Sequence, residues 1–204
     1  VVYENDGTQT FSRRIIATRA DDDKYTTEDI TQVHAADVDG DGNVDVISGA
    51  DSPNDPLEWH ENDGTGSFTT HTVNDNVGYP SDVSARDLDG DGDLDVIASL
   101  DGGSSSYQKT TWFENDGGGS FTRHAIGISS GLKGIDVADI DADGDRDVVA
   151  ARGNTGVVWY DNDGSENFFE RELPITVDGT APVELGSVED VYARDVDGDG
   201  RTDI

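Results

Sequence analysis

Four stretches of alternating aspartates are the residues best suited to chemistry in this chain. In the clearest, residues 87–95, aspartates stand at positions 1, 3, 5, 7 and 9, with glycines at positions 4 and 6. Five carboxylates this close repel one another, and ordering the glycines costs chain entropy. Binding of a hard cation would offset both costs. Known calcium loops have the same spacing: side-chain oxygens at positions 1, 3 and 5, a backbone carbonyl at position 7 and a glycine at position 6, where the chain turns. The stretch therefore predicts a Ca²⁺-binding loop.

The same pattern occurs four times, with first aspartates 50, 52 and 56 residues apart. A single acidic run is most often a solvated loop, but four copies in register argue against that interpretation. We therefore expect three to four Ca²⁺ ions, held by side chains at positions 1, 3, 5 and 9 and by the backbone carbonyl at position 7. The expected ligand residues, with position 7 included for its carbonyl, are Asp37, Asp39, Asp41, Asn43, Asp45, Asp87, Asp89, Asp91, Asp93, Asp95, Asp139, Asp141, Asp143, Asp145, Asp147, Asp195, Asp197, Asp199, Arg201 and Asp203.

Two of the four loops depart from the pattern. Ala142 replaces the glycine at position 4 of the third loop, and Arg146 takes its position 8. In the fourth loop, Arg201 and Thr202 occupy positions 7 and 8. We expect these two loops to bind Ca²⁺ more weakly, the fourth above all.

The composition favours an all-β domain stabilised by metal. The chain has 204 residues, 25 of them glycine, and no cysteine, so no disulfide can form and a metal ion would serve as the staple. The formal net charge of −32 would repel nucleic acid and anionic membranes. No apolar run approaches the roughly 20 residues of a membrane helix. We therefore expect no nucleic-acid partner and no membrane insertion.

The segments between the acidic loops have the pattern of strands and tight turns. Asn-Asp-Gly occurs four times, each time four residues before a phenylalanine. Such sequences favour hairpins, because glycine and asparagine tolerate positive φ. Apolar residues two apart precede each acidic loop, which is strand periodicity. One unit then consists of strand, calcium loop, strand, variable connection, strand, hairpin and strand. Four strands in about 50 residues is the size of a propeller blade.

The predicted fold is thus all-β, a single β-propeller region over residues 1–204 built of four four-stranded repeats. No helical pattern appears anywhere in the sequence. We place the repeat units at about 1–20 (a half unit), 29–73, 80–126, 133–175 and 188–204 (a second half unit).

These motifs resemble those of the FG-GAP or VCBS repeat family, whose members include the propeller of integrin α-subunits. The matching elements are the Asp-x-Asp-x-Asp-Gly-x-x-Asp loops with Val-Ile after them and the Trp-x-Glu-Asn-Asp-Gly hairpins, which recur through essentially the whole chain. The resemblance implies a β-propeller with one Ca²⁺ per loop, held between the first two strands of a blade. Family propellers usually have about seven blades, so we favour a piece of a longer propeller or repeat array. The alternative is a closed four-bladed ring, in which the N-terminal half unit completes the C-terminal one.

No pattern of catalytic residues emerges, and we predict that the chain is not an enzyme. His60, His71 and His124 stand at positions that other units fill with aromatic residues or arginine, so they are expected to serve the repeat architecture. His34 has no recognisable partner, and no nucleophile elbow, Walker loop or zinc spacing is present. The three tryptophans recur at one position of the unit and are expected to pack between blades, although such rings also stack on sugars.

We predict an extracellular, calcium-stabilised scaffold or binding module for adhesion, surface display, or matrix or fibre assembly. Loops of this kind should bind Ca²⁺ in the weak range of extracellular modules, about 10⁻⁴–10⁻³ M, so cytosolic calcium would leave them empty. The expected location is therefore outside the cell or on its surface. The partner there would be a protein or a carbohydrate, with further repeats or copies of the chain as additional partners. Two alternatives stay open: a glycan-binding lectin, and the non-catalytic propeller part of a secreted polysaccharide-active enzyme.

Overall fold

The computed structural model consists of β-strands and loops. It describes residues 1–5, 7–16, 30–50, 56–75, 77–101, 110–129, 131–153, 156–173 and 186–204. The unit boundaries expected at residues 20, 29 and 175 lie outside these ranges. The described residues form fourteen strands and no helix, as the sequence predicts. Accordingly, no described helix is long and apolar enough to cross a membrane.

Most strands belong to three antiparallel sheets of four, in which spatial neighbours are also neighbours in the sequence. Sheet 1 contains β3 (Ile30–Ala36), β4 (Asp45–Ala50), β5 (Leu57–Asn62) and β6 (Phe68–Asn74). Sheet 2 contains β7 (Tyr79–Arg86), β8 (Asp95–Asp101), β9 (Thr110–Asn115) and β10 (Phe121–Gly127). Sheet 3 contains β11 (Ile135–Ala138), β12 (Asp147–Ala151), β13 (Val157–Asn162) and β14 (Phe168–Glu172). The remaining strands, β1 (Val2–Asn5) and β2 (Phe11–Arg14), pair as a separate hairpin β1–β2.

The acidic loops and the Asn-Asp-Gly turns each connect the same pair of strands in every sheet. The acidic loops join the first two strands, so that position 9 of the loop begins the second strand; Asp95, for example, pairs with Arg86. The Asn-Asp-Gly turns join the last two strands, and Gly117 in the turn of sheet 2 has a φ of 78°. Glycine adopts this left-handed backbone without steric cost. The strand order within one unit therefore agrees with the prediction from the sequence.

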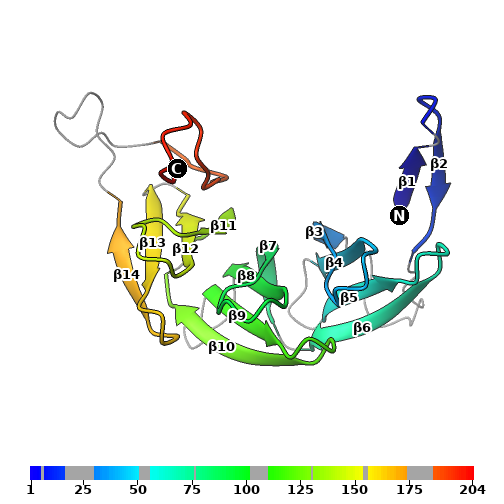
Figure 1. The fold of residues 1–204 in the computed structure, drawn as a ribbon, viewed down its shortest axis with the longest axis horizontal. Helices are drawn as coiled ribbons and strands as arrows, with labels where there is room; N and C mark the ends of the chain where they lie inside the picture. Colours follow the sequence, from blue (N-terminus) through cyan, green and yellow to red (C-terminus); the bar gives the residue numbers. More distant parts are fainter. Residues whose placement is uncertain are drawn as a thin grey trace.

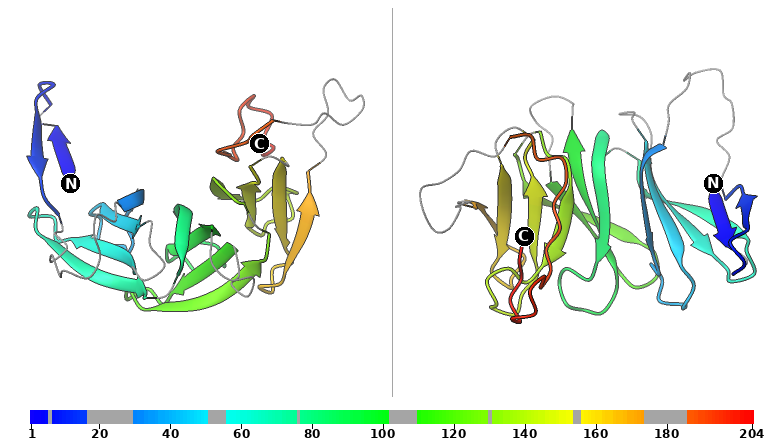
Figure 2. Two further views of the ribbon diagram at one scale, coloured as in Figure 1. Left: turned by 180° about the vertical axis from the view of Figure 1, so that it is seen from behind. Right: turned by 90° about the horizontal axis from the view of Figure 1, so that it is seen from above.

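The three sheets stand side by side along an open arc, shown in Figure 1. The first strands β3, β7 and β11 line the concave side of the arc, and the last strands β6, β10 and β14 line its convex side. Hairpin β1–β2 lies at one end of the arc and the C-terminal segment, residues 186–204, at the other (Figure 2). This is the arrangement of blades in a propeller, without closure of a ring.

Apolar cores fill the spaces between neighbouring sheets. The core between sheets 1 and 2 contains Trp59 and Phe113, and the core between sheets 2 and 3 contains Trp112 and Tyr160. Trp59 also meets Phe121 of sheet 2 edge-on, with ring centroids 6.4 Å apart. The expected packing of tryptophans between blades is thus confirmed for the first two of them.

The fourth repeat unit is not assembled within the described residues. Its two halves, hairpin β1–β2 and the C-terminal segment, lie at opposite ends of the arc, so the closed four-bladed ring is not the arrangement found. The three sheets, with apolar cores between neighbours, cover only part of a circle. The C-terminal segment begins a fourth blade with isolated bridges between Gly153 and Val188 and between Arg194 and Asp203.

Candidate metal centres

The aspartate loops repeat one local structure. Gly90 and Gly92, at positions 4 and 6 of the second loop, have φ values of 82° and 103°. Ala142 at position 4 of the third loop adopts the same left-handed conformation, with a φ of 65°. For alanine this conformation costs about 1–2 kcal/mol. The two left-handed residues fold the loop back on itself, which brings side chains from its beginning and its end together.

The aspartate at position 9 is the buried anchor of the first three loops. Asp45, Asp95 and Asp147 are all fully buried. In the second loop, Oδ2 of Asp95 accepts a hydrogen bond from the N–H of Leu88 at 2.9 Å, and Oδ1 accepts one from the N–H of Asn115 at 2.9 Å. The first and third loops repeat both bonds at 2.8–2.9 Å. One carboxylate thus fixes both the start of its loop and the third strand of its sheet.

Three carboxylates meet at one point in each of these loops. They come from positions 1, 3 and 9, and one oxygen of each lies within 4.8 Å of the others. Two oxygens that share a Ca²⁺ at about 2.4 Å lie up to about 4.8 Å apart, so the spacing suits this ion. The three groups, called the aspartate clusters below, are Asp37, Asp39 and Asp45; Asp87, Asp89 and Asp95; and Asp139, Asp141 and Asp147.

Two oxygens of the aspartate clusters are buried without a hydrogen-bond partner. They are Oδ1 of Asp37 and Oδ1 of Asp139, both at position 1 of their loops. A buried anionic oxygen with no partner is costly, and native structures rarely leave one so. A cation would provide the missing partner, and a donor set made only of oxygens suits a hard ion such as Ca²⁺. The residues present therefore fit a bound Ca²⁺.

Burial and mutual repulsion raise the pKa of several cluster carboxyls. Burial raises the pKa of Asp95 to about 6 and also raises that of Asp147. For Asp39 and Asp89, at position 3, burial raises the pKa and neighbouring carboxylates add to the effect. These shifts mean that the hydrogen bonds and charges of the protein do not offset the cost of burying the ionised carboxylates. A cation in the cluster would supply that compensation.

The carboxylates at position 5 do not belong to the first three clusters. Asp41, Asp91 and Asp143 instead accept hydrogen bonds from the backbone N–H at position 7, at 2.7, 2.8 and 2.9 Å. The structure thus brings together three of the four side-chain ligands expected in each loop. A ligand role for position 5 stays a prediction.

The side chain at position 7 lies against the hairpin of its own sheet. A Cβ added to Gly117 would lie 2.4 Å from a carboxylate oxygen of Asp93, and one added to Gly164 would lie 2.3 Å from Asp145. The side chains of these two residues therefore pack on the glycine of the turn. A ligand role for the backbone carbonyl at position 7 stays a prediction.

The fourth loop has a different cluster. Here the grouped carboxylates are Asp195, Asp197 and Asp199, all exposed, and Asp203 at position 9 is not among them. Asp203 accepts a hydrogen bond from the N–H of Val196 at 2.8 Å. Within the described residues, no third strand supplies the second amide that its counterparts have. The lower affinity expected for this loop stays a prediction.

The histidines of the hairpin strands take part in sheet packing. Nε2 of His71 lies 2.7 Å from the carboxylate of Glu61, and its ring stacks on Trp59 with centroids 4.5 Å apart. The same arrangement recurs in sheet 2 around His124. In sheet 3, Arg171 takes the equivalent place, 5.7 Å above the ring of Trp159.

The other two histidines are His60, which is buried, and His34, which is half-buried on β3. His60 is buried between the hydroxyls of Ser48 and Thr70, at 2.9 and 3.0 Å. Burial lowers the pKa of His60 and that of His34. Both shifts favour the neutral imidazole.

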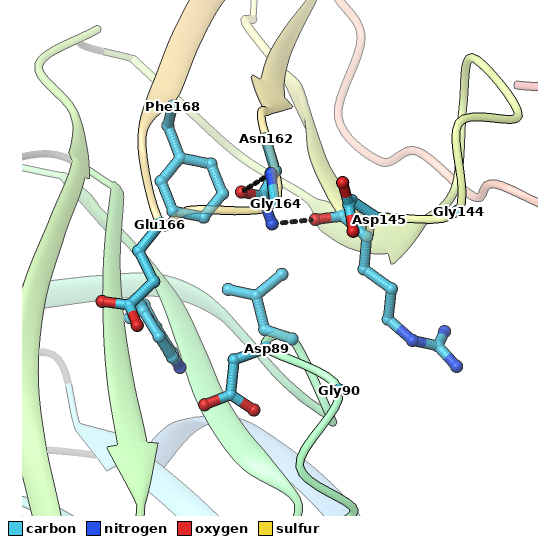
Figure 3. Close-up of a pocket in the computed structure, with 11 residues that line it drawn as sticks. Asp89, Gly90, Gly144, Asp145, Asn162, Gly164, Glu166 and Phe168 are labelled. Atoms are coloured by element: carbon cyan, nitrogen blue, oxygen red, sulfur yellow. Dashed lines mark hydrogen bonds between the residues drawn. The ribbon is translucent and has the colours of Figure 1, made fainter.

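A cleft of about 160 Å³ opens between sheets 2 and 3 beside the acidic loops (Figure 3). Its lining includes Trp112, Glu166 and Phe168. At the equivalent place between sheets 1 and 2, Trp59 packs so closely on Gly119 that a Cβ there would lie 2.3 Å from the indole. Glu166 takes the position of this glycine in sheet 3. Because Glu166 carries a side chain, Trp112 cannot pack as closely and the cleft remains.

The sequence analysis did not predict one set of hydrogen-bond donors to the aspartate clusters. The N–H groups of Asn62, Asn115 and Asn162 donate to the position-9 aspartates, and the sequence analysis assigns these asparagines only to turns. The available signal is that asparagine opens the turn in all four hairpin motifs. A repeated polar residue at a strand end indicates a repeated hydrogen bond.

Comparison with known families agrees with this architecture. The profile of the FG-GAP-like repeat matches residues 37–98, 99–150 and 139–204, which together run from residue 37 to residue 204. Among curated proteins, no sequence matches the chain.

Proposed function

We propose that this chain, which belongs to the FG-GAP-like repeat family, is a calcium-stabilised scaffold or binding module working outside the cell. Repeats of this family form β-propeller-type binding or scaffold modules and are typically parts of extracellular or surface proteins. The three sheets along the arc have that architecture. Its function would be adhesion, surface display or matrix assembly, with a protein or carbohydrate as partner.

The observation that carries the calcium part of the proposal is the pair of buried, unpartnered oxygens on Asp37 and Asp139. Positions 1, 3 and 9 of each loop would hold the ion, with position 5 and the position-7 carbonyl as further ligands. The bound ion would supply the positive charge that these buried, ionised carboxylates do not receive from the protein. Its effect would be structural, because position 9 also holds the third strand of the sheet.

A non-catalytic role is part of the proposal. It is supported by the engagement of His60, His71 and His124 in contacts within their own sheets: His60 with two hydroxyls, and His71 and His124 each with a tryptophan ring. It is also supported by the repetition of the aspartate clusters, since three equivalent sites suit a structural role better than a single active centre.

The test is calcium titration by calorimetry, together with thermal unfolding in chelator and in calcium at matched ionic strength. At a Ca²⁺ concentration tenfold above Kd, each site stabilises by about 1.4 kcal/mol, so three sites give roughly 4 kcal/mol. For a chain of this length, that should raise Tm by about 8–16 °C. Identical unfolding curves with and without calcium would refute the structural role of the metal.

The variants Asp39→Asn and Asp89→Asn should each remove about a third of the calcium-dependent shift, since each changes one of three clusters. Asp75→Asn is the matched control, because Asp75 is exposed and lies outside every cluster. A loss of the same size in the control would mean that overall charge, rather than the clusters, causes the calcium effect.

A further inference from the structure

The cleft between sheets 2 and 3 is a gap that the contact between sheets 1 and 2 does not have. In that other contact, Trp59 packs on Gly119, where a Cβ would lie 2.3 Å from the indole. Glu166 stands in the place of Gly119 in sheet 3, and an open space of about 160 Å³ remains beside Trp112. Both sheets that border the cleft have all four strands. The cleft therefore does not depend on where the sequence begins or ends.

A hydrogen bond that joins the other two sheets has no counterpart at the cleft. Between sheets 1 and 2, the side chain of Asn115 donates to the carbonyl of Val38 at 3.0 Å. Asn162 and Leu88 stand at the corresponding positions beside the cleft. Within the described residues, the side chain of Asn162 bonds only to its own unit. The hairpin of sheet 3 is thus not tied to the second acidic loop, and the space between them stays open.

Glu166 keeps a backbone conformation that glycine would adopt without strain. Its φ is 62°, in the left-handed region that is costly for a residue with a side chain. Strain of this kind persists mainly at sites where the side chain has a role. Within the part of the chain that the structure describes, no hydrogen bond or ion pair engages the carboxylate of Glu166. This side chain therefore opens the cleft and remains available to a group from outside.

The lining of the cleft combines aromatic rings with carboxylates. The rings belong to Phe168, which is half-buried, and to Trp112, which is buried behind it. The carboxylates belong to Asp89, Asp145 and Glu166. In Figure 3, Glu166 extends from the hairpin toward Asp89, and Phe168 lies above both. Carboxylates pair with cations and aromatic faces attract them, so the lining suits a cationic group.

Calcium in the two neighbouring loops would not reverse the negative charge around the cleft. The second loop has five aspartates, so one Ca²⁺ would leave it with a formal charge of −3. The third loop also has five aspartates, and one Ca²⁺ together with Arg146 would leave it with −2. Arg146 is exposed and is the one basic residue among the described lining. The calcium-bound chain would therefore still attract a cation to this place.

We propose that the cleft binds one basic side chain, a lysine or an arginine, of a protein partner. A cavity of about 150 Å³ holds a benzene molecule, so the cleft has room for one side chain. The apolar stem of that side chain packs on Phe168, and its charged head pairs with Glu166. A neutral sugar would gain nothing from the charge of the carboxylates. The inference rests on the proposed role as a binding module and narrows the partner to one with a basic segment, which complements a chain of net charge −32.

The first test titrates the calcium-saturated chain with capped five-residue peptides and follows the indole N–H signals of its three tryptophans by NMR. The peptides carry a central lysine, arginine or norleucine between glycines, and norleucine has an apolar stem without the charge. We expect a basic peptide to shift the signal of Trp112, but not those of Trp59 and Trp159, with a Kd on the order of 1 mM. The norleucine peptide should bind at least about fivefold more weakly. The stronger of the two basic peptides identifies the preferred side chain.

The second test repeats these titrations with variants of the cleft. Glu166→Gln removes the charge and should weaken binding of the basic peptide about fivefold. Glu166→Gly should let the hairpin close on Trp112, so that binding is lost while the Tm is kept or raised. Arg146→Leu, which gives the third loop the residue of the second at position 8, should strengthen binding about twofold. Asp75→Asn is the matched control, because Asp75 is exposed and outside the cleft, and it should leave the Kd unchanged.

Three results would overturn the proposal. One is no shift of the Trp112 signal with either basic peptide at about 10 mM, tenfold above the expected Kd. Another is equal affinity for the basic and norleucine peptides, or binding that Glu166→Gln leaves intact. The third is an equal loss in Asp75→Asn, which would mean general attraction to an acidic surface. Glucose that shifts the Trp112 signal where the basic peptides do not would assign the cleft to a sugar instead. The calcium-dependent Tm shift does not involve these peptides, so either proposal can fail alone.

Discussion

Replacing Asn115 with alanine should remove three hydrogen bonds within a blade and one between blades. The buried side chain of Asn115 accepts hydrogen bonds from the N–H groups of Gly117 and Gly119, at 3.2 and 3.1 Å. It donates to the carbonyl of Leu94 in its own unit and to the carbonyl of Val38 in the first acidic loop, both at 3.0 Å. The last bond ties sheet 2 to the loop of sheet 1.

The expected magnitude follows from counting these bonds. A hydrogen bond contributes about 1 kcal/mol net, and a buried group left unpaired costs about 1–3 kcal/mol. Asn115→Ala should therefore lower the free energy of unfolding by about 4 kcal/mol. Asn162 stands at the equivalent place in sheet 3, and within the described residues its side chain bonds Gly164 and Arg146 of its own unit, at 3.2 and 3.0 Å. Asn162→Ala should cost about 2 kcal/mol.

The assay is urea unfolding of both variants and the parent chain at one fixed calcium concentration, with the slope of each transition compared. Equal slopes would show that the midpoints report stability and not a change in the unfolded state. The informative quantity is the difference of about 2 kcal/mol between the two variants, to which the bond to Val38 and the bond from Gly119 each contribute about half. Equal losses would refute the claim that the bond from Asn115 to Val38 holds the two sheets together.

Gly119→Ala should destabilise the fold by about 1–3 kcal/mol in urea unfolding, because its Cβ would lie 2.3 Å from the indole of Trp59 on a backbone with a φ of 76°. Glu166→Gly, at the equivalent position, should instead stabilise by about 0.5–1 kcal/mol, because it relieves a left-handed glutamate with a φ of 62°; a loss of stability would contradict this. In chelator, the free energy of unfolding should rise as the pH falls from 7 to about 4.5. Burial raises the pKa of Asp95 in the folded chain to about 6, above its unfolded value of 3.8, so stability is lost as the pH rises between these values. The gain is at most about 3 kcal/mol, and a flat profile measured by unfolding at several pH values would argue against it.

Local chemistry made much of the fold predictable. Alternating aspartates with glycines at positions 4 and 6, and Asn-Asp-Gly turns such as that before Phe121, are signals contained within a few residues. Their spacing gives the order of strands in one blade, and the structure has this order in all three sheets. The aspartates at positions 1, 3 and 9 meet in the first three loops, and their role as metal ligands stays a prediction.

The features that the sequence did not reveal depend on contacts between distant residues. The bond from Asn115 to Val38 joins residues 77 positions apart, and no local pattern announces it. The open arc likewise depends on how Trp59 and Phe113 fill the space between sheets, and a closed four-bladed ring could not be dismissed from the motifs alone. The position-5 aspartates were expected among the ligands by analogy with known calcium loops, but in the first three loops they bond to the backbone.

The position-9 aspartate gives a physical reason why metal binding and blade assembly should depend on each other. Its two oxygens carry about four acceptor sites, and in Asp95 two of these are taken by the amides of Leu88 and Asn115. The remaining sites face Asp87 and Asp89 in the cluster, where a cation is the partner that suits them. Asp203 tests this reasoning within the same chain: among the described residues no third-strand amide reaches it, and it lies outside the cluster of its loop. Calcium should therefore bind most tightly where the third strand is already in place, and completing the fourth blade should strengthen the fourth site.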